Sequence, residues 1–123
     1  MSPYGNPATA KVISFTPTIL FVDDMTNLSQ ERLELGGQHV PVHAAFRDIS
    51  PHLLSEVQPD TVVSPLCGPG FDAADLASLL QEAGFRGRYR AVTRAIPKPW
   101  VVLREVRSLA PELNFDIWVV DHA

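Results

Sequence analysis

The chain has 123 residues, 46% hydrophobic and 20% charged, which is typical of one globular domain with its own core. Its apolar runs are far shorter than the roughly 20 residues of a membrane-spanning helix. Its start lacks the pattern of a secretory signal, and its single cysteine excludes an internal disulfide and a cysteine-based zinc site. We therefore expect a cytoplasmic protein with no membrane contact.

The net charge of −4 is unevenly distributed along the chain. Residues 86–107 hold seven of the ten basic groups and one acidic group, Glu105, so this segment carries +6 and the remainder −10. Such an asymmetry is typical of a face that binds an anion or an acidic partner, or of a solvated face whose arginines pair with acids elsewhere. The acidic total and the lack of an aromatic platform argue against nucleic-acid binding.

Residues 1–17 contain prolines and a glycine, and predict a loose tail or a short edge strand at 11–15 that Pro17 interrupts. A single domain is expected over residues 18–123. Residues 18–22 form a continuous apolar run, which suits a central parallel strand buried on both faces. Two acids, Asp23 and Asp24, follow directly.

Residues 25–46 fit two patterns. A helix would place Met25, Leu28 and Leu35 on one face and end at Gly36. A hairpin over about residues 31–46 would turn at Gly36 and Gly37, with apolar residues alternating on both arms. Both patterns predict a strand at residues 39–45.

The remaining elements alternate between helix and strand. A helix capped by Ser50 should end before Pro59, and a helix capped by Asp72 should end at Gly84. A third helix should open after Pro97 and Pro99, with its apolar face formed by Val102, Leu103, Val106, Leu109 and Ala110. Buried strands are expected at 61–66, 89–93 and 115–120. The alternation predicts an α/β fold with three layers, a mostly parallel five-stranded sheet and helices on both faces.

Two stretches resemble parts of the receiver domains of two-component systems. Residues 19–24, Ile-Leu-Phe-Val-Asp-Asp, resemble the first strand and the paired acids that help bind Mg²⁺ in functional members. Residues 58–73 resemble the third strand and the loop after it, including Pro69 and Gly70. Thr93 matches a hydroxyl residue that contacts the phosphoryl group. The resemblance implies a receiver-like, flavodoxin-like arrangement.

The chain departs from this family where the chemistry takes place. The acceptor aspartate is replaced by Pro65, which has no ionisable oxygen. The lysine after the fifth strand is not matched, since residues 121–123 read Asp-His-Ala, and the family's final helix is missing. The resemblance therefore implies a pseudo-receiver with no catalytic residue, no metal and no cofactor.

Two groups of residues are candidates for function. The carboxyl ends of parallel strands form the usual binding edge of an open α/β sheet, and they should bring together Asp23, Asp24, Pro65, Cys67 and Thr93. Cys67 precedes a helix, where a thiol can be activated, although it lacks a local histidine or arginine partner. The second group is an expected interaction face formed by Arg88, Arg90, Arg94, Lys98, Trp100 and Arg104.

The predicted function is contact rather than catalysis. We expect a phosphorylation-incompetent, receiver-like module in bacterial signalling that binds another protein or a second copy of itself. Trp100 is a suitable anchor, because large aromatic side chains dominate many interfaces. The alternative is a small enzyme or ligand-binding protein that uses Asp23, Asp24, Cys67 and Thr93.

Overall fold

The computed structural model describes residues 16–23, 38–94 and 98–120. Five strands form one parallel sheet in the order β2-β1-β3-β6-β7. These strands are β1 (Thr18–Val22), β2 (Val40–Ala44), β3 (Thr61–Pro65), β6 (Arg88–Thr93) and β7 (Asn114–Val119). The order matches that of flavodoxin-like doubly wound folds, and it confirms the predicted class and the predicted strands.

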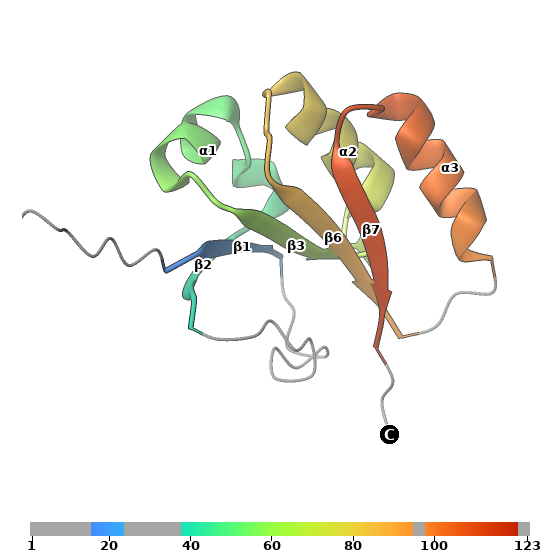
Figure 1. The fold of residues 1–123 in the computed structure, drawn as a ribbon, viewed down its shortest axis with the longest axis horizontal. Coiled ribbons are helices and arrows are strands. Elements are labelled where there is room, and N and C mark those ends of the chain that lie inside the picture. Colours follow the sequence, from blue (N-terminus) through green and yellow to red (C-terminus); the bar gives the residue numbers. More distant parts are fainter. Residues whose placement is uncertain (1–15, 24–37, 95–97, 121–123) are drawn as a thin grey trace, which may run out of the picture.

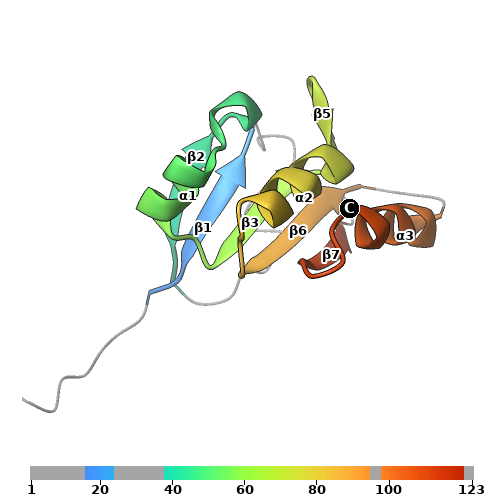
Figure 2. The same ribbon diagram turned by 90° about the horizontal axis from the view of Figure 1, so that it is seen from above.

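Three helices connect these strands: α1 (Pro51–Val57), α2 (Ala73–Glu82) and α3 (Pro99–Leu109). All three lie on the same face of the sheet (Figures 1 and 2). Helices were expected on both faces, and the described helices cover one of them. The alternatives for residues 25–37 and the edge strand at 11–15 lie outside the described residues. None of the described helices is long and apolar enough to cross a membrane.

The main core lies between the sheet and these three helices. The sheet contributes Leu20, Val62 and Tyr89, and α2 contributes Leu76 and Leu80, each with no exposed surface. A smaller apolar cluster lies on the opposite face and contains Ile19, Phe21, Val63, Val92 and Val120. β1 and β3 are therefore apolar on both faces, as expected for central strands of a parallel sheet.

Local signals set the helix boundaries. The Ser50 hydroxyl accepts a hydrogen bond from the Leu53 amide at 3.1 Å, and Pro51 is the first residue of α1. α1 ends at Gln58, whose φ of 49° is left-handed, so the chain turns one residue before Pro59. Gly84 (φ 77°) follows the end of α2, and the Phe85 amide then donates to the Leu80 carbonyl at 3.0 Å.

The structure corrects the predicted apolar face of α3. Val106 and Ala110 are buried and Val102 and Leu103 are half-buried, but Leu109 is 51% exposed. The residues of this segment that pack into the core are four positions apart: Val102, Val106 and Ala110. Leu109 lies at the edge of that stripe, where the helix has turned toward solvent.

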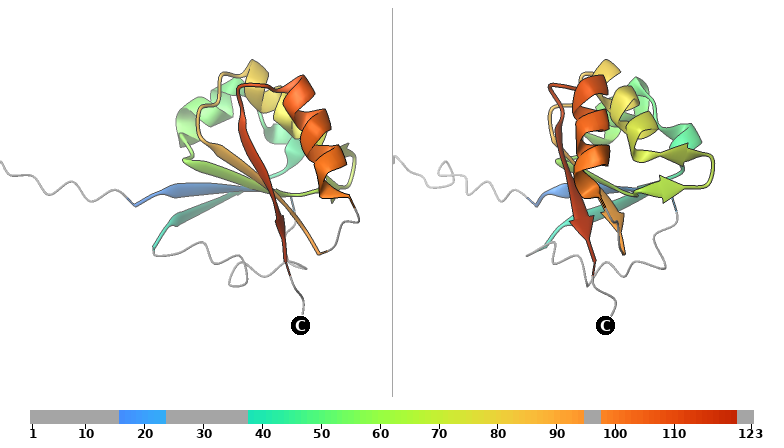
Figure 3. Two further views of the ribbon diagram at one scale, coloured as in Figure 1. Left: turned by 45° about the vertical axis from the view of Figure 1, so that its right-hand side comes forward. Right: turned by 90° about the vertical axis from the view of Figure 1, so that its right-hand side faces the viewer.

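A short hairpin that the sequence did not predict follows β3. It pairs β4 (Cys67–Gly68) with β5 (Phe71–Asp72) in antiparallel register. Gly70 has a φ of 80°, which suits the third position of a type II turn after Pro69. The hairpin stands out from the body of the domain at the carboxyl end of the sheet (Figure 3, right).

Candidate functional site

The carboxyl ends of β1, β3 and β6 meet at one edge of the sheet, because the three strands are parallel neighbours. The topology therefore brings Asp23, Pro65 and Thr93, three of the five residues named from the sequence, to this edge. All three are half-buried. Asp24 lies outside the described residues. This edge is the place where open α/β sheets bind their ligands.

Asp23 is held in an unusual backbone conformation at this edge. Its φ is 70°, in the left-handed region that residues other than glycine, asparagine and aspartate seldom adopt. Its amide donates to the Ala44 carbonyl at the end of β2, at 2.7 Å. Asp23 thus closes β1 against β2, and the same bond fixes the direction in which the chain leaves the sheet.

Pro65 is the last residue of β3 and lies in register with Val92 of β6. Its ring offers no group that could accept a phosphoryl group or bind a metal ion. Its carbonyl already accepts a hydrogen bond from the Ser64 hydroxyl at 2.9 Å. The next amide, that of Leu66, donates to the Val92 carbonyl at 2.8 Å and continues the sheet ladder. Pro65 thus continues the regular pairing of β3 with β6.

An aromatic stack closes the loop that follows. The rings of Phe46 and Phe71 are parallel within 1°, with centroids 4.5 Å apart. Gly68 lies directly under the Phe71 ring, so a Cβ atom at residue 68 would come within 2.3 Å of that ring. Phe71 is 6% exposed. The loop is therefore packed as a small apolar core rather than left open toward the sheet edge.

Cys67 is an exposed free thiol at the start of this hairpin. It pairs in register with Asp72, the residue that caps α2. The cap is reciprocal, since the Asp75 amide donates to Asp72 at 2.9 Å and the Asp72 amide donates to Asp75 at 3.0 Å. Asp72 and Asp75 therefore occupy the N-terminus of α2. This is the helix terminus that would have to lower the pKa of a thiol in order to activate it.

A buried polar pair lies next to this edge, on the helix-covered face. The Ser64 and Tyr89 hydroxyl oxygens are 2.6 Å apart, and both residues have no exposed surface. Because Ser64 donates to the Pro65 carbonyl, Tyr89 is the donor to Ser64. Burial raises the pKa of Tyr89 far above its ordinary value, the bond to Ser64 acts against this, and Asp72 adds to it. The strand pattern alone did not predict this pair, because the two residues are 25 positions apart.

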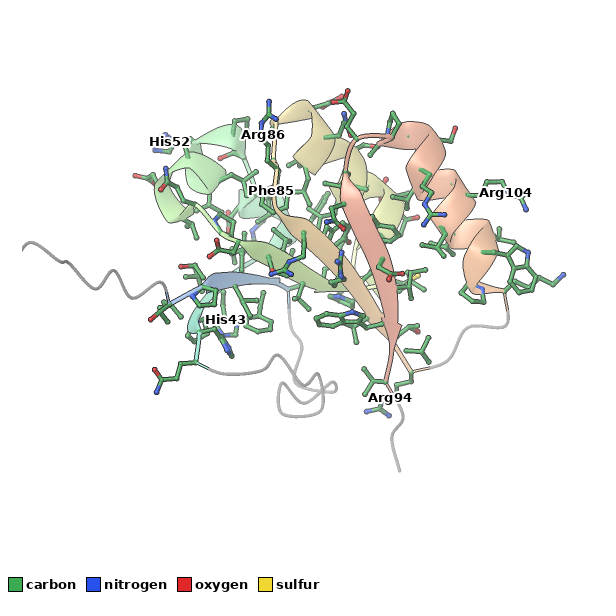
Figure 4. The ribbon with its side chains drawn as sticks, viewed as in Figure 1. His43, His52, Phe85, Arg86, Arg94 and Arg104 are labelled. Carbon is green, nitrogen blue, oxygen red and sulfur yellow. The ribbon has the colours of Figure 1, made fainter. Side chains whose placement is uncertain are left out.

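The residues expected to form one interaction face divide into two groups. Arg88 and Arg90 lie on the sheet face opposite the helices, since they alternate with the core residues Tyr89 and Ala91. A second group lies on α3 and the residue before it, and its members Lys98, Trp100 and Arg104 are exposed. Arg94 is exposed as well, but it follows the end of β6 and belongs to neither group. Figure 4 shows Arg104 pointing outward from α3, while Arg94 lies at the far end of β6.

The described part of this edge does not fit a metal ion. Mg²⁺ requires six oxygen ligands in near-octahedral geometry, usually including carboxylates. Within residues 16–23, 38–94 and 98–120, no three histidine, cysteine, aspartate or glutamate side chains come close enough together to hold a metal ion. Pro65, the last residue of β3, has no side-chain oxygen to offer as a ligand.

Solved structures similar to this chain are receiver domains. The signal receiver domain of the response regulator NarL from Mycobacterium tuberculosis aligns with a TM-score of 0.63 and 16% identity, over 88% of this chain and 86% of that one. A LuxR-family two-component response regulator from an Aurantimonas species aligns with a TM-score of 0.55 and 20% identity, over 77% of this chain and 69% of that one. The chain has the receiver-domain fold.

At these identities the likeness is one of fold. No family model matches the receiver-like chain, and no curated protein matches it. The roles of its individual residues therefore depend on the geometry described above. That geometry retains the sheet order and the strand-end edge, and it has Pro65 where the resemblance expects the phosphoryl acceptor.

Proposed function

We propose that this chain is a receiver-like interaction module in bacterial signalling or regulation that cannot be phosphorylated at the acceptor position. Pro65 is the observation that carries the proposal. Without an oxygen nucleophile at the end of β3, no acyl phosphate can form there. The hydrogen bond from Ser64 to the Pro65 carbonyl and the Phe46–Phe71 stack support a packed structural role for this edge.

The exposed side of α3 is the best candidate for the contact surface. Trp100 is 54% exposed, and Arg104 and Arg107 follow it at spacings of four and three residues, so the three share one stripe of the helix. Apolar Val101 and Leu109 are also about half exposed. An aromatic anchor flanked by arginines is typical of interface hot spots, and it suits a partner with an acidic surface.

The alternative of a small enzyme has less support from the described residues. Cys67 is paired in register with Asp72, whose carboxylate already accepts a hydrogen bond from the Asp75 amide as the cap of α2. Asp23 follows β1 and Thr93 ends β6, and these two strands are separated by β3, which ends in Pro65. Binding through α3 accounts for the exposed aromatic, apolar and basic side chains of that helix, which catalysis at the strand ends would leave unexplained.

The absence of phosphoryl transfer can be tested on the purified chain. The protein is incubated with Mg²⁺ and acetyl phosphate, and its intact mass is measured beside that of an active receiver domain as a positive control. We expect no added phosphoryl group under conditions that modify the control. A stable adduct on an aspartate would contradict the proposal, and peptide mapping would then locate it.

The interaction role is tested by a matched pair of variants. Trp100→Ala combined with Arg104→Glu changes the α3 stripe, and His52→Ala changes an exposed residue of α1. Proteins captured from the producing cells by the wild-type chain should be lost with the α3 variant and retained with the control. Equal capture by both variants, or self-association that neither variant changes, would show that α3 is not the contact surface.

A further inference from the structure

A cavity of about 380 Å³ lies on the sheet face opposite α1, α2 and α3. It crosses four neighbouring strands, β1, β3, β6 and β7. The residues that matter for its chemistry are Ile19, Thr61, Arg88, Arg90, Asp116 and Trp118. Its size falls in the range of about 300–1,000 Å³ found for small-molecule sites. It is separate from the strand-end edge and from the α3 stripe.

Strand register explains how this cavity is lined. Ile19 pairs with Thr61 and Thr61 with Arg88, so the three form a row across β1, β3 and β6. Ile19 is 5% exposed and Thr61 is 7% exposed, and together they form a floor. Trp118 is half-buried and packs against the apolar cluster of this face, where it supplies an aromatic wall.

Arg90 is held in place by its neighbours. One guanidinium nitrogen, Nη1, donates to the carbonyls of Tyr89 and Asn114, each at 3.0 Å. Both terminal nitrogens also contact the Asn114 side-chain oxygen at 3.3 Å. Burial lowers the pKa of Arg90, Asp116 acts in the opposite direction, and Arg88 adds to the lowering. A fixed guanidinium with reduced hydration is a good partner for an anion, since little rotamer freedom remains to be lost.

The cavity carries an excess of positive charge. The Arg88 backbone amide donates to the Asp60 carbonyl at 3.0 Å, but the Arg88 side chain forms no hydrogen bond or ion pair with the residues that the structure describes. Asp116 uses one carboxylate oxygen to accept a hydrogen bond from the Ile117 amide at 2.8 Å. In the described part of the chain, no ion pair within 4.0 Å joins Asp116 to either arginine. Two guanidinium groups and one carboxylate leave a net charge of +1 in the cavity.

We propose that this cavity binds a small aromatic carboxylate. The ring packs against Trp118 and Ile19, while the carboxylate accepts hydrogen bonds from Arg88 and Arg90 in the forked geometry that guanidinium groups favour. A carboxylate carries one negative charge and matches the net charge of the cavity, whereas a phosphate monoester carries about −1.5 to −2. This site goes beyond the proposed function, because it would give the domain a ligand input that does not involve phosphorylation.

The test uses 2-naphthoate as the probe and its neutral amide, 2-naphthamide, as the matched control. Titrations are followed by NMR on a Trp100→Phe background, which leaves Trp118 as the single tryptophan of the chain. We expect a saturable shift of the Trp118 indole signal and the Ile19 methyl signals with naphthoate. The amide should bind about tenfold more weakly, since it lacks the charge-assisted hydrogen bonds.

Two arginine variants assign the site. Arg88→Gln removes a side chain that holds no described structural contact, so the fold should be retained, and naphthoate should bind about tenfold more weakly. Arg47→Gln, at an exposed position between β2 and α1 that does not line the cavity, should leave binding unchanged. The proposal is overturned if naphthoate produces no saturable shift, if the amide binds equally well, or if Arg88→Gln has no effect. Self-association altered by Arg88→Gln, without naphthoate binding, would instead identify a protein interface.

Discussion

The hydroxyl oxygens of Ser64 and Tyr89 lie 2.6 Å apart in the core, between two neighbouring strands of the sheet. The bond continues to the Pro65 carbonyl, which accepts from Ser64 at 2.9 Å. A polar chain thus runs from the middle of β6 to the end of β3, where the resemblance to receivers expects the acceptor. Pro65 is held by structural hydrogen bonding rather than exposed for chemistry.

Removing both partners of this pair should cost less stability than the sum of the two single losses. Ser64→Ala leaves the buried Tyr89 hydroxyl without its acceptor, at a cost of about 1–3 kcal/mol, and Tyr89→Phe leaves Ser64 without its donor. The double variant should lose less stability than the sum of the single variants, as measured by urea denaturation. Additive losses would mean that the two hydroxyl groups do not interact.

Tyr89 should also make stability fall at high pH. Burial raises the pKa of its phenol in the folded state, so the unfolded chain loses this proton at lower pH than the folded chain does. The stabilisation is therefore fully present below the ordinary tyrosine pKa of about 10, and it is lost as the pH rises from there through the raised pKa of the folded state. Denaturation curves between about pH 8 and 11 should show a steeper decline for Tyr4→Phe than for Tyr4→Phe combined with Tyr89→Phe. Parallel declines would contradict this assignment.

The packing of Phe71 on Gly68 predicts a specific rescue. Gly68→Ala would place a methyl group 2.3 Å from the Phe71 ring and should destabilise the domain by about 1–3 kcal/mol. Phe71→Leu combined with Gly68→Ala should recover part of the loss. Gly70→Ala is the control, because its cost of about 1 kcal/mol comes from a positive φ and not from contact, so Phe71→Leu should not rescue it. Equal rescue of both variants would rule out the contact.

The two faces of α3 should respond differently to truncation. Val106 has no exposed surface and contacts the core, so Val106→Ala should cost about 2 kcal/mol through lost burial and a residual cavity. Leu109 is 51% exposed, and Leu109→Ala should change stability by less than about 0.5 kcal/mol. Thermal denaturation of the two variants separates these outcomes. A loss of stability for Leu109→Ala as large as that for Val106→Ala would mean that Leu109 packs in the core, as the helical spacing alone predicted.

The sequence predicted those parts of the fold that depend on local pattern. The apolar run at 18–22 predicted β1, and Ser50, Asp72 and Gly84 predicted the helix ends. The position of Leu109 was predicted wrongly, because helical spacing defines a stripe but not which edge of it the sheet covers. The Ser64–Tyr89 bond and the row Ile19, Thr61 and Arg88 depend on strand order and register, which no local pattern specifies.

The same reasoning explains the division of the basic residues. The alternation of residues along β6 places Arg88 and Arg90 on the opposite face from Tyr89. It did not predict that α3 would cover the Tyr89 face and so place Trp100 and Arg104 on the other side of the sheet. That arrangement depends on how α3 packs against the rest of the domain. The charge count of residues 86–107 does not predict this packing.

The proposed lack of phosphoryl chemistry at the strand-end edge is open to a direct test. The most direct measurement is amide chemical-shift mapping during titration with Mg²⁺ and beryllofluoride, a phosphoryl mimic. We expect no saturable, localised shifts at the amides of Asp23, Leu66 and Thr93. Saturable shifts confined to these amides, lost on chelation of the metal, would contradict the account and restore an active receiver site.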